Sequence, residues 1–299
     1  MRLEEFLKAR YPGSVGDAVL AVSAAAIDVW QKIPFMTGLV SGMNPSGEKQ
    51  TEIDVYANDV FVRALTSSGI AAEVASEEME RPAMGDGQLH VSMDPLDGSS
   101  NIETNNPLGS IFGFYSERLP CSGERMLGAA FVTYGTMVTV TFSSGGAVHR
   151  FVAVNEGQGY SYRLMNESLV IPRESEVYGV GGLRKEWVPA VQRFVSYLEE
   201  RGLKTRYCGT FVGDYNQVLK HGGIFAYPAL KTRPKGKLRI LFETAPIAYI
   251  TERAGGYASY GSGSILSLRP SSLSETSPAY IGSSPIVKEL EEMLRKGNA

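Results

Sequence analysis

The sequence predicts an α+β protein in which helices and sheets pack in layers. Two observations support this fold class. Helix-like segments come first in the chain, and a run of strand-like segments separated by glycine turns then fills residues 108–154. After about residue 175 strands and helices alternate, as they do where helices cover a sheet. With 299 residues the chain can bury a large core in one or two domains.

The N-terminal region predicts two helices joined by a loop. Residues 17–33 are apolar and rich in alanine, and Pro34 would end this helix. Residues 34–50 are rich in Gly, Pro, Ser and Asn and predict a mobile loop. The second helix, residues 51–67, has Asp54 in its first turn, where the helix dipole favours a carboxylate. Taken alone, Asp54 is therefore most simply a helix-start residue.

Acidic side chains follow the next two predicted strands. Residues 70–74 lead into Ser76-Glu77-Glu78, and the alternating segment 89–93 leads into Asp94. We expect Pro95 to stop this second strand, because proline removes an amide donor. Asp97 follows across a turn, so Asp94 and Asp97 can converge on one cation.

Residues with bare amides and hydroxyl groups come directly after these two aspartates. Gly98, Ser99 and Ser100 suit the oxygens of a phosphate group. Hard acids beside anion-binding amides predict a site that holds Mg²⁺ and phosphate together.

The rest of the chain predicts a meander of strands and then alternating elements. Strands are expected at 111–115, 127–134, 137–142, 148–154, 176–180, 205–208 and 224–227, and helices at 186–201, 212–220, 238–253 and 284–296. The composition changes near residues 165–180, which predicts a boundary between an N-terminal half, 1–170, and a C-terminal half, 171–299.

Composition excludes several function classes. The net charge of −3 gives no support to nucleic-acid binding. Cys121 and Cys208 lie far apart, which fits a reducing compartment and excludes a disulfide framework. The three histidines stand apart in the sequence, which argues against a zinc site. The first residues predict no signal peptide, and no apolar run reaches the roughly 18 residues of a membrane span. We therefore expect a cytoplasmic protein that binds no membrane.

Several motifs occur in a fixed order along the chain. They are Ile53–Asp59, Ser76–Glu78, Asp94–Asn101, Gly109–Tyr115, Arg206-Tyr207, Gly222–Pro228, Lys235–Glu243 and Ala254–Gly256. Together they closely resemble class I fructose-1,6-bisphosphatases. The Asp94–Gly98 string alone resembles the wider superfamily of lithium-sensitive phosphatases, which includes inositol monophosphatases. The resemblance implies a layered α-β-α-β-α fold with mixed sheets and helices between and outside them.

The resemblance also implies a set of metal and catalytic residues in the N-terminal half, the equivalent of the family's AMP domain. It implies that Mg²⁺, two or more ions per subunit with Mn²⁺ as a substitute, is bound by Glu77, Glu78, Asp94, Asp97, Glu243 and the carbonyl group of Leu96. Asp54 and Glu78 would lie beside the attacking water. Glu48 stands where the family usually has Asp, on a loop that we expect to move over the metals. Gly98, Ser99 and Ser100 would hold the transferred phosphoryl group.

A second phosphate group would bind in the C-terminal half without being cleaved. By the resemblance, Tyr207, Tyr227 and Lys237 hold it, and Arg206 reaches in from a neighbouring subunit of a homotetramer or homodimer. Without the resemblance, Arg206, Lys235, Lys237 and Arg239 would be interpreted as a solvated basic face.

Two stretches depart from the family pattern. Gly181-Gly182-Leu183-Arg184 replaces the usual Asn-Glu-Gly-Tyr and looks more like sedoheptulose-1,7-bisphosphatase, so either sugar bisphosphate or both remain candidate substrates. The AMP-binding segment is reduced to Lys8–Pro12, and Gln88-Leu89 replaces a Lys-Tyr pair, which predicts weak or no inhibition by AMP. An inositol monophosphatase and an inactive sugar-phosphate sensor are the more distant alternatives.

Overall fold

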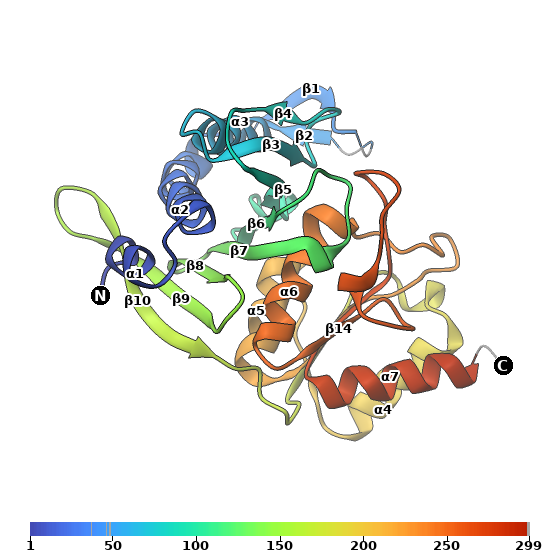
Figure 1. Cartoon of the computed structure of the whole chain (residues 1–299). Coiled ribbons are helices and arrows are strands. Elements are labelled where there is room, and N and C mark those ends of the chain that lie inside the picture. The colour runs from blue at the N-terminus through green and yellow to red at the C-terminus, as the bar shows by residue number, and fades with distance from the viewer. Residues whose placement is uncertain (37, 46, 48, 298–299) are drawn as a thin grey trace.

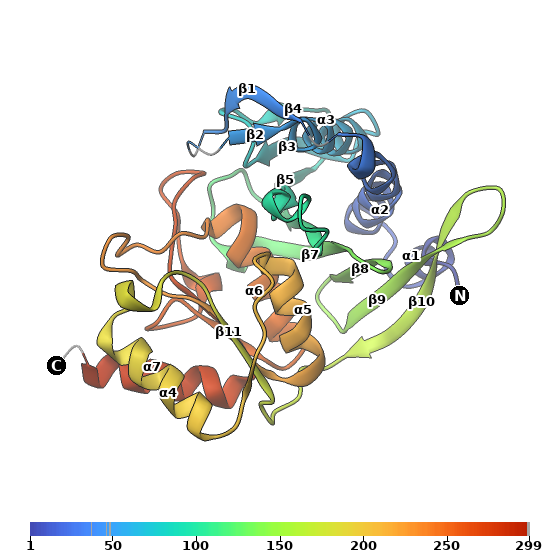
Figure 2. The same cartoon turned by 180° about the vertical axis from the view of Figure 1, so that it is seen from behind.

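A computed structural model describes residues 1–36, 38–45, 47 and 49–297 and arranges them in five layers (Figure 1). The first layer contains α1 (Leu3–Arg10), α2 (Ser14–Lys32) and α3 (Glu52–Thr66), which lie on one face of an eight-stranded sheet. On its other face, α5 (Phe211–His221) and α6 (Ala245–Arg253) separate it from a five-stranded sheet. The last layer consists of α4 (Pro189–Glu200) and α7 (Ser284–Gly297), which lie side by side (Figure 2). The expected α-β-α-β-α arrangement is confirmed.

Both large sheets are mixed, as expected. The eight-stranded sheet has the order β10-β9-β8-β7-β6-β5-β3-β4, and only β3 and β5 are parallel neighbours. Its strands are β3 (Ala71–Ser76), β4 (Ala83–Met84), β5 (Leu89–Asp97), β6 (Leu108–Tyr115), β7 (Met126–Tyr134), β8 (Val138–Ser143), β9 (Val148–Asn155) and β10 (Tyr160–Leu169). The second sheet has the order β12-β11-β13-β15-β14. Its strands are β11 (Val177–Val180), β12 (Lys204–Thr205), β13 (Gly223–Tyr227), β14 (Tyr257–Ser259) and β15 (Ala279–Gly282).

The prediction that Pro95 stops its strand is wrong, because β5 continues to Asp97. The pairing of β5 with β6 shifts register between Asp94 and Asp97, so the ladder needs no amide hydrogen at the proline. The Pro95 carbonyl instead accepts a hydrogen bond from the buried Ser110 hydroxyl at 2.8 Å. Both aspartates consequently belong to one rigid strand.

The prediction that residues 34–50 form a loop is only partly correct. It contains a short antiparallel hairpin of β1 (Leu39–Met43) and β2 (Lys49–Thr51). The sequence analysis also missed α1, β10, β14 and β15. The long helix expected at 238–253 divides into a π-helix, Ile240–Thr244, followed by α6.

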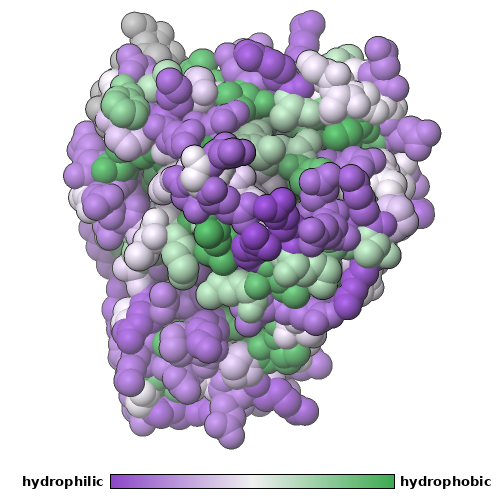
Figure 3. All heavy atoms as spheres, turned by 90° about the vertical axis from the view of Figure 1, so that its left-hand side faces the viewer, coloured by the Kyte–Doolittle hydropathy of each residue, from purple (hydrophilic) through white to green (hydrophobic). Residues whose placement is uncertain are grey.

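Helix α2 is more apolar than expected. The segment Ser14–Phe35 has a mean hydropathy of 1.3 and is long and apolar enough to cross a membrane, contrary to the expectation that no segment would be. One face of α2, including Ala18, Val22 and Val29, is fully buried against the sheet. Seen from the side on which α1 and α2 lie, hydrophilic side chains interrupt the apolar patches (Figure 3). Composition alone is therefore weak evidence for a span, because the core helix of a soluble protein has the same property.

Candidate active site

The ends of several elements enclose a cavity of about 390 Å³ between the two sheets. Its size lies within the range of small-molecule binding sites. Of the residues singled out in the sequence, it brings together Asp54, Glu77, Glu78, Asp94, Leu96, Asp97, Gly98, Ser99, Ser100, Tyr207, Tyr227, Lys237 and Glu243. Arg206 does not line it, and Glu48 lies outside the described residues.

Asp97 connects the two halves of the chain at this cavity. Its two carboxylate oxygens accept hydrogen bonds from the backbone amides of Phe211 (3.1 Å) and Val212 (2.7 Å) at the start of α5. The N-terminal end of a helix favours a negative charge. Burial nevertheless raises the pKa of Asp97 to about 7. The two amide hydrogen bonds therefore hold the carboxylate in place, but they do not fully offset the cost of burying its charge.

The turn after Asp97 requires a glycine. Gly98 has φ +81°, and a Cβ atom there would lie 2.0 Å from Cγ2 of Thr210. Only glycine adopts this conformation without strain and also leaves room for Thr210. The segment before α5 therefore packs directly on the turn formed by Gly98, Ser99 and Ser100.

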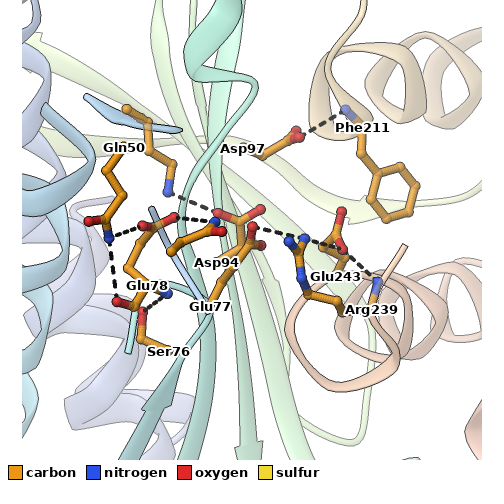
Figure 4. A network of polar contacts seen from close by, with 11 residues as sticks. Gln50, Ser76, Glu77, Glu78, Asp94, Asp97, Phe211, Arg239 and Glu243 are labelled. Atoms are coloured by element: carbon orange, nitrogen blue, oxygen red, sulfur yellow. Dashed lines mark hydrogen bonds and ion pairs between the residues drawn. The ribbon is translucent and has the colours of Figure 1, made fainter. Parts of the chain in front are cut away.

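A buried acidic cluster surrounds one arginine in the middle of the cavity (Figure 4). Glu77, Asp94 and Glu243 are each less than 8% exposed. The Arg239 guanidinium lies 2.8 Å from Glu77 and 3.4 Å from Glu243. Burial, and then the charges of Glu77, Asp97 and Glu243, raise the pKa of Asp94 well above its usual value. Burial and neighbouring carboxylates therefore act together to favour the protonated form of Asp94.

The donor atoms of this cluster fit a hard cation. All the candidate side-chain ligands are carboxylates, which Mg²⁺ prefers, and soft ligands such as thiolates are not among the cavity-lining residues described. Within the described part of the chain, however, no three acidic, histidine or cysteine side chains already form an ion-binding group. Arg239 instead pairs with two of these carboxylates, Glu77 and Glu243.

Glu78 lies on the other side of the cluster and is held by two amide side chains. Nε2 of Gln50 donates to it at 2.5 Å and Nδ2 of Asn44 at 3.3 Å. Burial raises the pKa of Glu78, and these two hydrogen bonds act in the opposite direction. Figure 4 shows Gln50 approaching Glu78 from the hairpin side. A carboxyl group with a raised pKa is suited to exchanging a proton near neutral pH.

Asp54 both lies at the start of a helix and faces the site, which are the two roles that the sequence analysis gave it. It is the third residue of α3, and Oδ2 accepts hydrogen bonds from the amide and hydroxyl groups of Thr51, both at 2.8 Å. It is therefore part of a helix cap. It also lines the cavity and contributes to the raised pKa of Glu78.

Aromatic and basic side chains form another part of the cavity wall. Tyr207, Tyr227 and Lys237 line it, and burial followed by the nearby Tyr227 raises the pKa of Tyr207 to about 12. The Cys208 amide donates to Oδ1 of Asp214 at 2.6 Å, which fixes the Tyr207 loop to α5. Arg206 is exposed, and its guanidinium donates to the Thr205 carbonyl of its own chain at 3.0 Å.

Sequence reasoning missed four residues of this site. Arg239 was interpreted as part of a solvated face, and that interpretation is wrong because the side chain is 7% exposed and ion-paired. Its spacing of four residues before Glu243 was the available signal. Gln50 and Asn44 lie in the segment interpreted as a loop. Asp214, buried on α5, carried no signal of its own.

Comparisons with known proteins agree with this geometry. Residues 20–163 match the family model "Fructose-1-6-bisphosphatase, N-terminal domain", and residues 171–295 match the corresponding C-terminal domain. A class 1 fructose-1,6-bisphosphatase of Natronomonas pharaonis is 40% identical over 94% of this chain and 99% of its own. One from Haloarcula marismortui is 39% identical over 93% and 94%. The crystal structure of Leishmania major fructose-1,6-bisphosphatase in holo form has a TM-score of 0.92 at 30% identity and covers 99% of both chains.

Proposed function

Because the chain belongs to the fructose-1,6-bisphosphatase family, we propose that it hydrolyses fructose 1,6-bisphosphate to fructose 6-phosphate and inorganic phosphate. The observation that carries this proposal is the single cavity that joins an acidic cluster to a wall of tyrosine and lysine. Such a cavity offers one end to a phosphate group that is cleaved and another to a phosphate group that is only bound.

The acidic end suits a divalent cation. Glu77, Glu78, Asp94, Asp97, Glu243 and the Leu96 carbonyl are the proposed ligands for two or more Mg²⁺ ions, with Mn²⁺ as a substitute. When bound, Mg²⁺ would neutralise phosphate charge and stabilise the departing sugar oxygen. The raised pKa values of Asp94, Asp97 and Glu243 support this assignment: burial is their main cause, neighbouring carboxylates add to it at Asp94 and Asp97, and a bound cation would favour the ionised form of each group.

The protein's own groups position the phosphoryl group and accept the proton. The turn at Gly98, Ser99 and Ser100 holds the phosphoryl oxygens, and Glu78 or Asp54 removes a proton from the attacking water. Glu48, which lies outside the described residues, is the third proposed catalytic acid. Since phosphoryl transfer depends on positioning and charge compensation, no covalent intermediate with the protein is needed.

The uncleaved phosphate binds in the C-terminal half, 171–299, through Tyr207, Tyr227 and Lys237. Arg206 completes this site from a neighbouring subunit, which makes the functional unit a homodimer or homotetramer. The exposed position of Arg206, outside its own cavity, supports this arrangement. The metal-binding residues lie mainly in the N-terminal half, 1–170, and the enzyme functions in sugar-phosphate metabolism in the cytoplasm.

A phosphate-release assay tests the proposal. The wild-type enzyme should release phosphate from fructose 1,6-bisphosphate with Mg²⁺, and EDTA or the Asp97→Ala substitution should abolish release. Asp28→Ala, an exposed position on α2, is the matched control. Sedoheptulose 1,7-bisphosphate and inositol 1-phosphate are the comparison substrates. A strong preference for either one, or no release from any of them at saturating Mg²⁺, would contradict the proposal.

A further inference from the structure

The backbone at the end of β11 is fixed on both sides at Gly181. Its amide donates to the Ala226 carbonyl at 2.8 Å, which extends the ladder with β13 by one residue. Its carbonyl accepts a hydrogen bond from the indole Nε1 of the buried Trp187 at 2.9 Å. Gly181 therefore has little freedom to move away from its neighbours.

The aromatic ring of Tyr227 occupies the space that a side chain at position 181 would need. A Cβ atom on Gly181 would lie 2.5 Å from both Cδ2 and Cε2 of Tyr227 and 3.1 Å from Cγ. Contacts below 3.0 Å force one partner to move, because packed atoms do not overlap. The backbone of Gly181 needs no positive φ, unlike that of Gly182, which has φ +79°. The glycine at 181 is therefore required for space and not for conformation.

The ring in question belongs to the substrate cavity. Tyr227 lines the cavity together with Tyr207, and its side chain is only partly buried. We infer that Gly181 is a positioning residue: by lacking a side chain it lets the Tyr227 ring lie against the end of β11, and this sets where the phenol stands. The inference rests on the proposed function, because it assigns the positioned phenol to binding of the uncleaved phosphate.

Steady-state kinetics with fructose 1,6-bisphosphate provides the test. Gly181→Ala should raise KM about tenfold, because the displaced ring no longer meets the ligand, and should change kcat by less than about twofold. The residues assigned to the chemistry lie on α3, after β3, on and after β5, and in the π-helix, and the three atoms nearest to a Cβ at Gly181 all belong to Tyr227. Gly135→Ala is the matched control, since a Cβ atom there meets nothing within 4 Å. An unchanged KM in Gly181→Ala would overturn the inference.

A double-mutant cycle with Tyr227→Ala separates positioning from a general structural role. If Gly181 acts through Tyr227, adding Gly181→Ala to Tyr227→Ala should leave KM unchanged from that of Tyr227→Ala alone. Independent, additive increases would overturn the inference. If Gly181→Ala lowers the thermal midpoint, the double variant should recover it, because truncating the ring makes room for the new methyl group; no recovery would count against the inference.

These outcomes are distinct from those that bear on the proposed function. A wild-type enzyme without phosphate release contradicts the function itself. An active wild-type enzyme whose KM does not respond to Gly181→Ala contradicts only the positioning role.

Discussion

Arg239 forms an ion pair with Glu77 at 2.8 Å, inside a cluster of carboxylates assigned to cations. Lys237 lines the same cavity, and the positive charges of Arg239 and Lys237 both lower the pKa of Glu243. The stability of the metal-free protein and the protonation of its carboxyl groups therefore depend on these charges.

Replacing Arg239 by methionine should destabilise the metal-free protein at pH 8 by about 3–5 kcal/mol, because it leaves buried carboxylates without their partner. The loss should be much smaller at pH 5, where more of these carboxyl groups are protonated. Urea unfolding in EDTA at both pH values measures the difference. Arg63→Met, at an exposed position on α3, is the control. Equal losses of stability at pH 5 and pH 8 would show that packing and not charge is lost.

The metal-free protein should lose stability as pH rises. The pKa of Asp97 is about 7 in the folded state, against an ordinary value of 3.8 for an aspartate in the unfolded chain, so between these values the folded state binds more protons than the unfolded state. The free energy of unfolding then decreases with pH through this interval, by on the order of 4 kcal/mol for this group alone. Unfolding of EDTA-treated protein from pH 4 to pH 8 measures the slope.

In the Asp97→Asn variant this slope should flatten, whereas Asp28→Asn should keep it. Adding Mg²⁺ to the wild-type protein should raise the thermal midpoint more at pH 8 than at pH 6, since ionised carboxylates bind the cation. A metal-free stability that rises between pH 5 and pH 7 would contradict the prediction.

Gln50→Ala should move the acidic limb of the pH profile of kcat/KM to higher pH. The Gln50 amide lowers the pKa of Glu78, so its removal raises that pKa, and the carboxylate form becomes scarcer at a given pH. Activity should fall at pH 6 and recover at pH 8.5. Gln158→Ala, in an exposed turn, should leave the profile unchanged. If Gln50→Ala lowers the rate equally at every pH, Glu78 is not the group that titrates.

AMP should not inhibit the enzyme through its N-terminal segment. Gln88-Leu89 replaces the Lys-Tyr pair that the family uses to bind the phosphate, and Lys8 and Arg10 form only surface ion pairs, with Glu4 at 2.7 Å and with Glu167 at 2.5 Å. The Tyr11 hydroxyl forms a 2.6 Å hydrogen bond with His149. Phosphate release measured over a titration of AMP should therefore fall only weakly or not at all, and potent inhibition with a nucleotide bound near residues 5–20 would refute this.

Local sequence signals were sufficient to predict elements that have a strong hydrophobic periodicity or a clear residue at which they begin or end. The helix start with Asp54 in its first turn, and the strand that leads into Glu77, could be predicted because each depends on residues close in sequence. The continuation of β5 through Pro95 could not, since it depends on a register shift against β6. Helix α1 is short, and its burial depends on packing of Phe6 against Phe142 and Phe151.

In the site, too, local sequence signals identified some residues, and others depend on tertiary contacts. The carboxylates could be predicted from motifs, but the charge state of the cluster could not. That state depends on Arg239, whose side chain reaches Glu77 across a sequence separation that no local pattern reports. The amide groups of Asn44 and Gln50 likewise meet Glu78 only through the tertiary fold.

The π-helix at Ile240–Thr244 has a consequence for how this enzyme can evolve. Its wide turn is anchored by the Ser92 hydroxyl, which donates to the Leu241 carbonyl at 2.7 Å. A π-turn holds one residue more than an α-turn, so deleting the codon of Thr244, which lies between Glu243 and α6, would restore a regular helix. That deletion would rotate Glu243 by about 100° relative to α6 and away from the cavity, while the helix itself survived. A lineage could thus lose catalysis in one step and keep the fold.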